Sequence, residues 1–203
     1  MMHAQPHQLS NDLVWYASYG SNLSIDRFMT YIEGGVAPGS LRSQPGARNA
    51  TPPRHIMPFT LPYSLYFAGE SSFWTGGMGF LDHTAVGATL ARAYLITREQ
   101  FIDVVTQENH LTDPVQIDFD TAINDGTSRI QPTSPYGLLL HAGHRDNYPV
   151  FTFTSEQPGQ TRTVPSARYL DTIAQGLMQT HKLTTDEAHA YLRSFITQPA
   201  AIS

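Results

Sequence analysis

The sequence predicts an α+β protein with one domain, and three observations support that class. Short runs rich in β-branched and aromatic residues alternate with turn residues up to about residue 155. Helical periodicity appears after residue 24, again after residue 97, and dominates beyond residue 165. No repeat and no linker separate two apolar cores, and 203 residues suit a single domain.

The predicted domain occupies residues 13–198, between a polar tail at 1–12 and a short tail at 199–203. Within it, residues 36–62 are proline-rich and show little periodicity, so we expect a long irregular loop that lines a site. Composition and flanking turn residues predict strands at Leu13–Ser18, Tyr63–Ala68, Gly87–Ile96, Val115–Phe119, Tyr136–His141 and Val150–Ser155.

Helix signals mark the remaining elements. Ser24 is expected to cap a helix that ends at Gly34, with Leu23 and Phe28 placed as a hydrophobic staple. A second helix starts near Ser166, and a third opens with a capping box at Thr184–Glu187. These two C-terminal helices both present an apolar face, which predicts that they pack on the sheet.

The bulk composition narrows the class of partner. A net charge of −5 with a pI near 5.9 argues against nucleic acid or an anionic membrane as the main partner. The chain has no cysteine, which excludes disulfides and thiolate metal sites. Residues 1–12 lack a basic region before an apolar run, and no apolar stretch approaches 20 residues. We therefore expect a soluble, cytoplasmic protein whose oligomeric state the sequence leaves open.

The stretch YASYGSNL at residues 16–23 is the first candidate site. It follows a strand and precedes a helix, yet it contains no charge, no metal ligand and no strong nucleophile. One interpretation is a simple turn. The other is a small polar cradle, in which backbone N–H groups and short side chains meet a negative charge, and in which Gly20 allows close approach or a positive φ.

A carboxylate on an apolar stripe is the second candidate. Residues 97–109 read TREQFIDVVTQEN, and Thr97 with Gln100 predicts a capping box at the helix start. Glu108 falls on the same face as Phe101 and Val104, whereas Asp103 is expected to face solvent. Burial raises a carboxyl pKa and suits it to acid/base work. The alternative is that the helix frays before Glu108 and leaves it in solvent.

These segments, with three further ones in the same order, resemble the γ-glutamylcyclotransferase family. Phe73–Gly77 resembles a tryptophan-glycine segment of the family, residues 94–108 resemble its strand–helix unit ending in Gln107-Glu108, and Pro165–Tyr169 resembles its Pro-Ser-x-x-Tyr helix. The resemblance covers residues 14 to 196.

The resemblance implies a small mixed β-barrel flanked by helices and an enzyme that releases 5-oxoproline and an amine or amino acid from a small γ-glutamyl substrate. By resemblance, Glu108 is the general acid/base, and the substrate-binding residues are Tyr19, Gly20, Ser21, Asn22, Leu23 and Tyr169. The substrate's own α-amino group is the nucleophile, so no cofactor and no metal are expected.

Two other functions stay open. One is a binding module on the same scaffold for a γ-glutamyl or amino-acid group, and the other is an enzyme of the same fold that cleaves an unrelated acyl–amine bond. One departure bears on specificity: family members often have a tyrosine shortly after the catalytic glutamate, and residues 109–119 contain none. Recognition of the leaving amine is therefore expected to differ.

Other conspicuous residues have simpler interpretations. His141, His144 and Asp146 lie where a strand runs into a turn, so exposed turn histidines are favoured over a metal site. Arg54 is favoured as a solvated loop residue over a carboxylate ligand, and Trp74 as a core or pocket wall over a substrate contact. The glycines near residue 77 lack the rest of a nucleotide-binding motif. Without the resemblance, Tyr169 would be assigned to the core.

Overall fold

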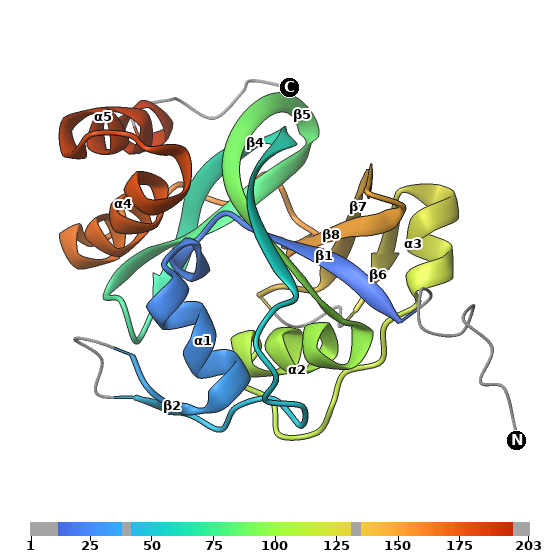
Figure 1. Cartoon of the computed structure of the whole chain (residues 1–203). Helices are drawn as coiled ribbons and strands as arrows, with labels where there is room; N and C mark the ends of the chain where they lie inside the picture. The colour runs from blue at the N-terminus through green and yellow to red at the C-terminus, as the bar shows by residue number, and fades with distance from the viewer. Residues whose placement is uncertain (1–11, 38–41, 131–134, 197–203) are drawn as a thin grey trace, which may run out of the picture.

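A computed structural model describes residues 12–37, 42–130 and 135–196, and it confirms the α+β class (Figure 1). The helices are α1 Ile25–Glu33, α2 Arg98–Glu108, α3 Phe119–Asp125, α4 Ala167–His181 and α5 Thr185–Ile196, with a 3₁₀ turn η1 at Ser21–Leu23. The strands are β1 Leu13–Ser18, β2 Gly35–Val36, β3 Ser43–Gln44, β4 His55–Ser71, β5 Gly76–Thr97, β6 Thr127–Arg129, β7 Leu138–Arg145 and β8 Tyr148–Thr154.

The main sheet is mixed and has the order β4-β5-β1-β8-β7-β6. Strand β1 lies inside it, antiparallel to β5 and parallel to β8. All six residues of β1 are buried, because both faces of this strand are covered. Val14 and Tyr16 point to one core, whereas Trp15 and Ala17 point to the other. This alternation is the period of two expected for a strand.

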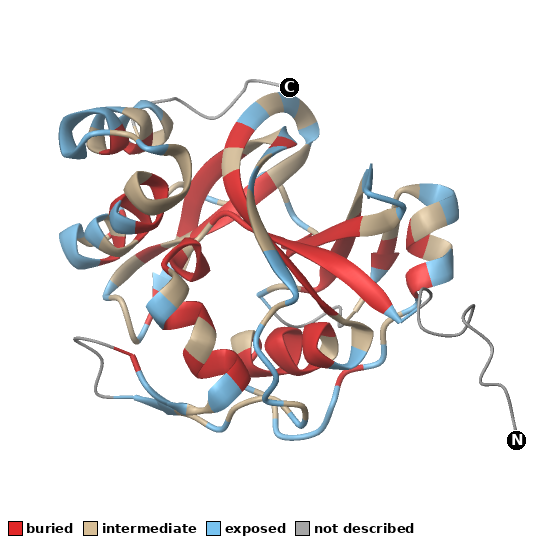
Figure 2. Ribbon diagram, viewed as in Figure 1, coloured by how far each residue is buried: buried red, intermediate tan, exposed pale blue. Residues whose placement is uncertain are grey.

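Helices cover the two faces in separate groups (Figure 1). On one face, α1 and α2 pack Phe28, Ile32 and Phe101 against the β1 side chains. On the other face, α4 and α5 contribute Ile173 and Leu192. Buried positions therefore run through the centre of the molecule between the helical groups, as Figure 2 shows. No helix in the described ranges is both long enough and apolar enough to cross a membrane.

The β4–β5 hairpin bends across the sheet and brings its far half to the end of β8. The Leu81 N–H donates to Thr154 Oγ1 at 2.8 Å, and the Thr163 N–H donates to the carbonyl of Phe67 at 3.1 Å. Ala68 forms an isolated bridge with Arg162. These contacts curve the predicted mixed sheet towards a barrel. Among the described residues, the hydrogen-bonded strand order itself stays open.

The prediction of an irregular loop over residues 36–62 was wrong at several positions, because Val36, Ser43–Gln44 and residues 55–62 belong to strands β2, β3 and β4. Strand β4 begins at His55, and Pro58 pairs with Arg92 of β5. A proline lacks an N–H donor and is tolerated at a sheet edge, and β4 is the edge strand of this sheet. Pro62 lies at an irregularity in the register, between Leu61 and Tyr63. Residues 38–41 of the predicted loop lie outside the described residues.

Two further predictions were wrong. Residues 115–118 are not a strand, and Phe119 instead begins α3 because the Asp118 side chain accepts from the Thr121 N–H at 2.9 Å and caps the helix. Asp103 does not face solvent. It is buried, and it accepts from both the backbone N–H and the Nε of Arg48, at 2.9 and 2.8 Å.

The helix starts were predicted with more success. The capping box at Thr97 and Gln100 is confirmed, with hydrogen bonds of 3.0 and 3.1 Å, and reciprocal bonds also join Thr184 and Glu187. Ser24 occupies the N-cap position of α1, but its side chain makes no capping bond. The expected staple is absent as well, because Leu23 and Phe28 belong to different cores.

Helix α4 fixes the position of the segment after β1. A Cβ added at Gly176 would lie 2.4 Å from the backbone carbon of Leu23, so α4 and η1 are packed as closely as a glycine permits. We expect Gly176→Ala to destabilise the protein by about 1–3 kcal/mol through overpacking, although alanine alone favours a helix by about 1 kcal/mol. Urea unfolding measures the change.

Gly159→Ala is the control, because a Cβ there meets nothing within 4 Å. A Gly176→Ala protein as stable as the Gly159→Ala protein would contradict the close packing of α4 on Leu23.

Candidate functional site

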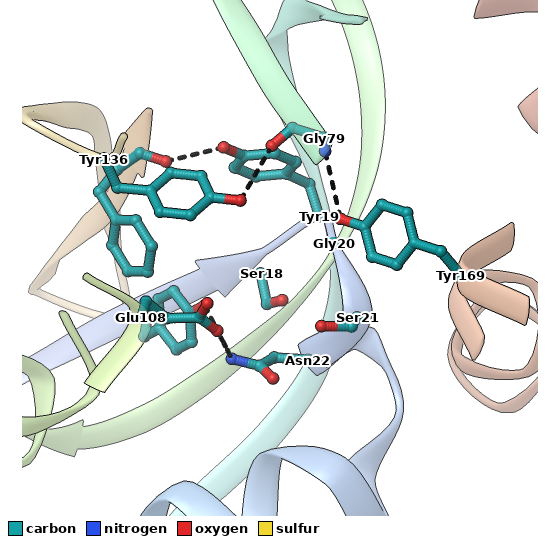
Figure 3. Close-up of a pocket in the computed structure, with 11 residues that line it drawn as sticks. Ser18, Tyr19, Gly20, Ser21, Asn22, Gly79, Glu108, Tyr136 and Tyr169 are labelled. Atoms are coloured by element: carbon teal, nitrogen blue, oxygen red, sulfur yellow. Dashed lines mark hydrogen bonds between the residues drawn. The ribbon is translucent and has the colours of Figure 1, made fainter. Parts of the chain in front are cut away.

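The segment after β1 and the end of α2 meet at one cavity of about 300 Å³ (Figure 3). The two segments are more than eighty residues apart in sequence. Neutral polar groups and aromatic rings surround a single carboxylate in this cavity. Its lining consists of Tyr16, Ser18, Tyr19, Gly20, Ser21, Asn22, Gly79, Glu108, Tyr136, Phe153 and Tyr169.

The length of α2 explains how Glu108 arrives there. Leu13 pairs with Thr97, so α2 starts beside the beginning of β1. Its 11 residues span about 16 Å, close to the length of about 20 Å for the six residues of β1. The helix contacts Tyr16 through Phe101 on the way. Its last residue, Glu108, therefore reaches the turn that follows β1.

The turn itself is held by hydrogen bonds on the side away from the cavity. The Leu23 N–H donates to the Gly20 carbonyl at 3.0 Å, and the Tyr94 hydroxyl donates to the Asn22 carbonyl at 2.7 Å. Gly20 has a φ of −105°, so a left-handed conformation is not the reason for glycine. The reason is space, because a Cβ there would lie 3.2 Å from the Tyr169 hydroxyl.

Glu108 accepts a hydrogen bond from one neighbour and is influenced by a second polar group. Asn22 Nδ2 donates to Oε1 at 2.8 Å (Figure 3), and the Tyr31 hydroxyl helps to lower the pKa of the carboxyl. Burial raises the pKa of Glu108 above its ordinary value, and this effect outweighs the nearby Arg27 charge and the two donors, which lower it. The residue is still partly exposed, because the carboxylate faces the cavity. A proton-exchanging group thus lies at a site open to a ligand.

A buried arginine organises the far side of the turn. Arg27 Nε donates to Ser21 Oγ at 2.8 Å, and its terminal nitrogen donates to the Tyr31 hydroxyl at 3.2 Å. Because Ser21 accepts this bond, its own hydroxyl proton is left to donate elsewhere. Tyr31 in turn connects Arg27 to Glu108. Arg27 and Tyr31 were not predicted from the sequence.

Two tyrosine hydroxyls form hydrogen bonds with the backbone of Gly79 at the opposite wall of the cavity. The Tyr169 hydroxyl accepts from the Gly79 N–H at 3.2 Å, and the Tyr136 hydroxyl donates to the Gly79 carbonyl at 3.4 Å (Figure 3). Burial raises the pKa of Tyr169 to about 12, so its hydroxyl stays protonated. Since Tyr169 accepts from Gly79, its own proton can be donated into the cavity.

Tyr136 is an aromatic residue of this cavity that was not predicted from the sequence. No tyrosine occurs in residues 109–119, but Tyr136 enters the same cavity from the segment before β7. Asn109 holds it there: Nδ2 donates to the Tyr136 carbonyl, and Oδ1 accepts from the Tyr136 N–H, both at 3.1 Å. The residue after Glu108 therefore positions a tyrosine 27 residues further along. No local pattern relates these positions.

The structure thus brings together six of the seven residues predicted from the sequence, namely Glu108, Tyr19, Gly20, Ser21, Asn22 and Tyr169. Leu23 lies apart from them. Its side chain is fully buried in the core with α4, and its N–H is bonded within the turn. The alternative that α2 frays before Glu108 is also excluded, because the helix extends through this residue.

A second cavity of about 500 Å³ adjoins the first. Ser21, Glu108, Tyr136 and Tyr169 line both. The additional lining is basic and aromatic: Arg27, Tyr31, Arg42, Gln44, Ser71, Phe73, Trp74, Met78 and His110. Trp74 is therefore a pocket wall, with its ring 5.0 Å from that of Tyr169.

The remaining candidates lie elsewhere. His141 and His144 are on β7 before a tight turn at Asp146, and their ring centroids are 4.9 Å apart. His144 is exposed, as predicted, whereas His141 is partly buried. Within the described ranges, no group of three or more His, Cys, Asp or Glu residues is placed to hold a metal ion. Arg54 is exposed and lines neither of the two cavities.

The raised pKa of Glu108 predicts how stability depends on pH. Between the ordinary carboxyl pKa of 4.5 and the raised value, the folded state binds more protons than the unfolded state. Stability from this group is therefore complete below 4.5 and is lost as the pH rises through the raised pKa. We expect the stability of Glu108→Gln relative to wild type to increase as the pH rises from 4 to 8, measured by urea unfolding.

Glu187→Gln is a control of opposite sign. Hydrogen bonds from Thr184 lower the pKa of Glu187, so wild type should gain stability over this variant as the pH rises. A difference between wild type and Glu108→Gln that does not change with pH would contradict the raised pKa.

Comparison with known proteins gives one sequence relative and a fold. The chain matches no protein-family model. It is 34% identical over 205 residues to a protein of Arabidopsis thaliana named histone deacetylase 5. That alignment covers 92% of this chain but only 31% of the plant protein, so the chain spans about a third of the length of this relative.

Solved structures give the clearer comparison. A structure described as gamma-glutamyl cyclotransferase superimposes with a TM-score of 0.52 and 12% identity, covering 95% of this chain and 92% of the other. The crystal structure of a human protein described as uncharacterized gives the same values. At this identity the likeness concerns the fold, and it extends over nearly the whole of both chains. The chain therefore has the γ-glutamylcyclotransferase fold.

Proposed function

We propose that this protein is a γ-glutamylcyclotransferase-like enzyme that converts a small γ-glutamyl substrate into 5-oxoproline and a free amine or amino acid. The observation that carries the proposal is the hydrogen bond between Asn22 and Glu108 inside one cavity. It joins the polar turn and the raised-pKa carboxylate, the two features that this reaction requires.

The reaction needs no nucleophile from the protein. The α-amino nitrogen of the substrate attacks its own γ-carbonyl carbon, a five-membered ring closes, and the bond to the leaving nitrogen breaks. Holding the substrate in the folded shape makes this step intramolecular, which can supply about 7–11 kcal/mol in well-oriented cases. The aromatic walls of the cavity suit that task.

Glu108 is assigned the proton transfers. As a carboxylate it takes a proton from the α-ammonium group, which frees the lone pair for attack. It then delivers a proton to the departing nitrogen, and the second ammonium proton follows to solvent or to the released amine. Charge is conserved, because the ammonium group lost by the substrate reappears on the amine product.

The turn and Tyr169 are assigned the role of stabilising the negative charges of the substrate carboxylate and of the developing oxyanion. The first N–H groups of a helical turn have no acceptor within the turn, so the backbone at Ser21 and Asn22 suits a substrate carboxylate or the developing oxyanion. The hydroxyls of Ser21 and Tyr169 each retain a proton to donate. Tyr19 serves as wall, since its hydroxyl is committed to the Phe153 carbonyl at 2.8 Å. Leu23 is assigned to supporting the turn.

A binding module on the same fold is the alternative, and Glu108 separates the two. We expect wild type to form 5-oxoproline from at least one member of a panel of γ-glutamyl amines and amino acids. Glu108→Gln should lower turnover by about 10²–10⁴-fold, because the amide keeps the size of the side chain but exchanges no proton. Direct detection of 5-oxoproline measures this, and calorimetry with the variant tests whether substrate still binds.

Glu99→Gln, an exposed acid in the first turn of the same helix, should retain wild-type turnover. Binding without any cyclic product would favour the binding module. Amine release without 5-oxoproline would indicate a different acyl–amine cleavage.

The pH dependence of kcat/KM tests the assigned base. We expect an ascending limb above the ordinary carboxyl pKa of 4.5, because burial raises the pKa of Glu108 and the base must be ionised. In Glu108→Gln, residual activity should lack this limb. A limb that survives the substitution would assign the base to another group.

A further inference from the structure

The lining of the second cavity is more basic than acidic, although the net charge of the whole chain is negative. The chain has a formal net charge of −5, yet this cavity is lined by two arginines, Arg27 and Arg42, and its single acid is Glu108. Basic side chains gathered at a cavity wall favour a ligand that bears negative charge.

Arg27 is the most enclosed of these groups. Only 8% of its surface is exposed, and its guanidinium donates hydrogen bonds to two neutral hydroxyls, those of Ser21 and Tyr31. Among the described residues, none forms an ion pair with it. A buried charge without an ion-pair partner is costly.

Aromatic rings hold the guanidinium in place. Its central carbon lies 4.9 Å from the ring centroid of Trp74, 5.2 Å from that of Phe73 and 5.6 Å from that of Tyr31. Such contacts recover part of the desolvation cost and fix the plane of the side chain. They hold Arg27 in a fixed position at the wall of the second cavity, where a ligand carboxylate would neutralise its charge.

In the proposed binding mode, the glutamyl part and the leaving amine of the substrate occupy different cavities, and the scissile bond lies where the cavities meet. Glu108 and Tyr169 line both, so the reacting atoms belong where the cavities meet. If the glutamyl part occupies the first cavity beside the turn, the leaving amine extends into the second, towards Arg27 and Trp74.

We propose that Arg27 is a specificity-determining residue that binds a carboxylate on the leaving amine, so that the protein prefers γ-glutamyl substrates with an anionic leaving part over γ-glutamyl derivatives of simple amines. The proposal rests on the proposed function, and it assigns the substrate class of the same site. A carboxylate at Arg27 supplies the opposite charge that the hydroxyls of Ser21 and Tyr31 do not.

A matched substrate pair tests the preference. L-γ-glutamyl-L-alanine and L-γ-glutamylethylamide differ only in the carboxylate of the leaving amine. We expect wild type to favour the alanine derivative by about 10–100-fold in kcat/KM, mainly through KM. Arg27→Gln should lose most of this ratio by weakening the alanine derivative alone, and Arg27→Lys should restore part of it.

Arg168→Gln is the matched control. Arg168 lies over the same rings, 5.6 Å from Phe73 and 5.5 Å from Trp74, but it is exposed and does not line the second cavity. It lines a third cavity, which Arg27 and Trp74 also line. This variant should keep the wild-type ratio.

The outcomes are distinguishable. Equal kcat/KM for the two substrates in wild type would overturn the assigned preference and leave the proposed function intact. An equal loss on both substrates in Arg27→Gln would show that Arg27 only supports Ser21 and the turn, or binds the glutamyl carboxylate, and would also overturn it. Absence of 5-oxoproline from both substrates would remove the proposed function and this inference together.

Discussion

The site depends on one partly buried carboxylate whose desolvation cost is only partly offset by its neighbours. Glu108 ends a helix at a cavity wall, where burial disfavours its charge and raises its pKa. Donors from Asn22 and Tyr31 offset part of that cost without cancelling it. The surrounding tyrosines, themselves buried and protonated, keep the cavity neutral. A carboxyl group so placed releases its proton at a higher pH than an ordinary glutamate does, and it lies beside the polar turn.

The fold delivers these groups through the geometry of one strand and one helix. Because β1 is covered on both faces, its position is fixed, and the turn that follows it is equally constrained. The antiparallel partner β5 leads into α2, which returns along β1 and ends at the turn. Contact between Gly176 and Leu23 then fixes the turn from the opposite side. Catalytic precision in such a site comes from packed elements rather than from flexible loops.

The walls of the two cavities differ in chemical character. Neutral donors and aromatic edges surround the first, where the proposed ring closure is an intramolecular event. A guanidinium stacked among aromatic rings lies at the wall of the second, where the proposed leaving part would extend. Arg27 is linked to both, because it bonds Ser21 of the turn and Tyr31, and its charge also acts on Glu108. In the proposed function, binding of the leaving part would therefore affect the carboxylate.

Local signals in the sequence determined the α+β class, the β1 strand, the start of α2 and the face on which Glu108 lies, because periodicity and capping depend on residues a few positions apart. Tertiary structure alone decided the rest. Tyr136 reaches the cavity only through its bonds to Asn109, and β4 accommodates Pro58 only because it forms a sheet edge. Arg27 looks like an ordinary polar helix residue until Trp74 packs over it. Each of these features depends on contacts between segments distant in sequence, which no local pattern encodes.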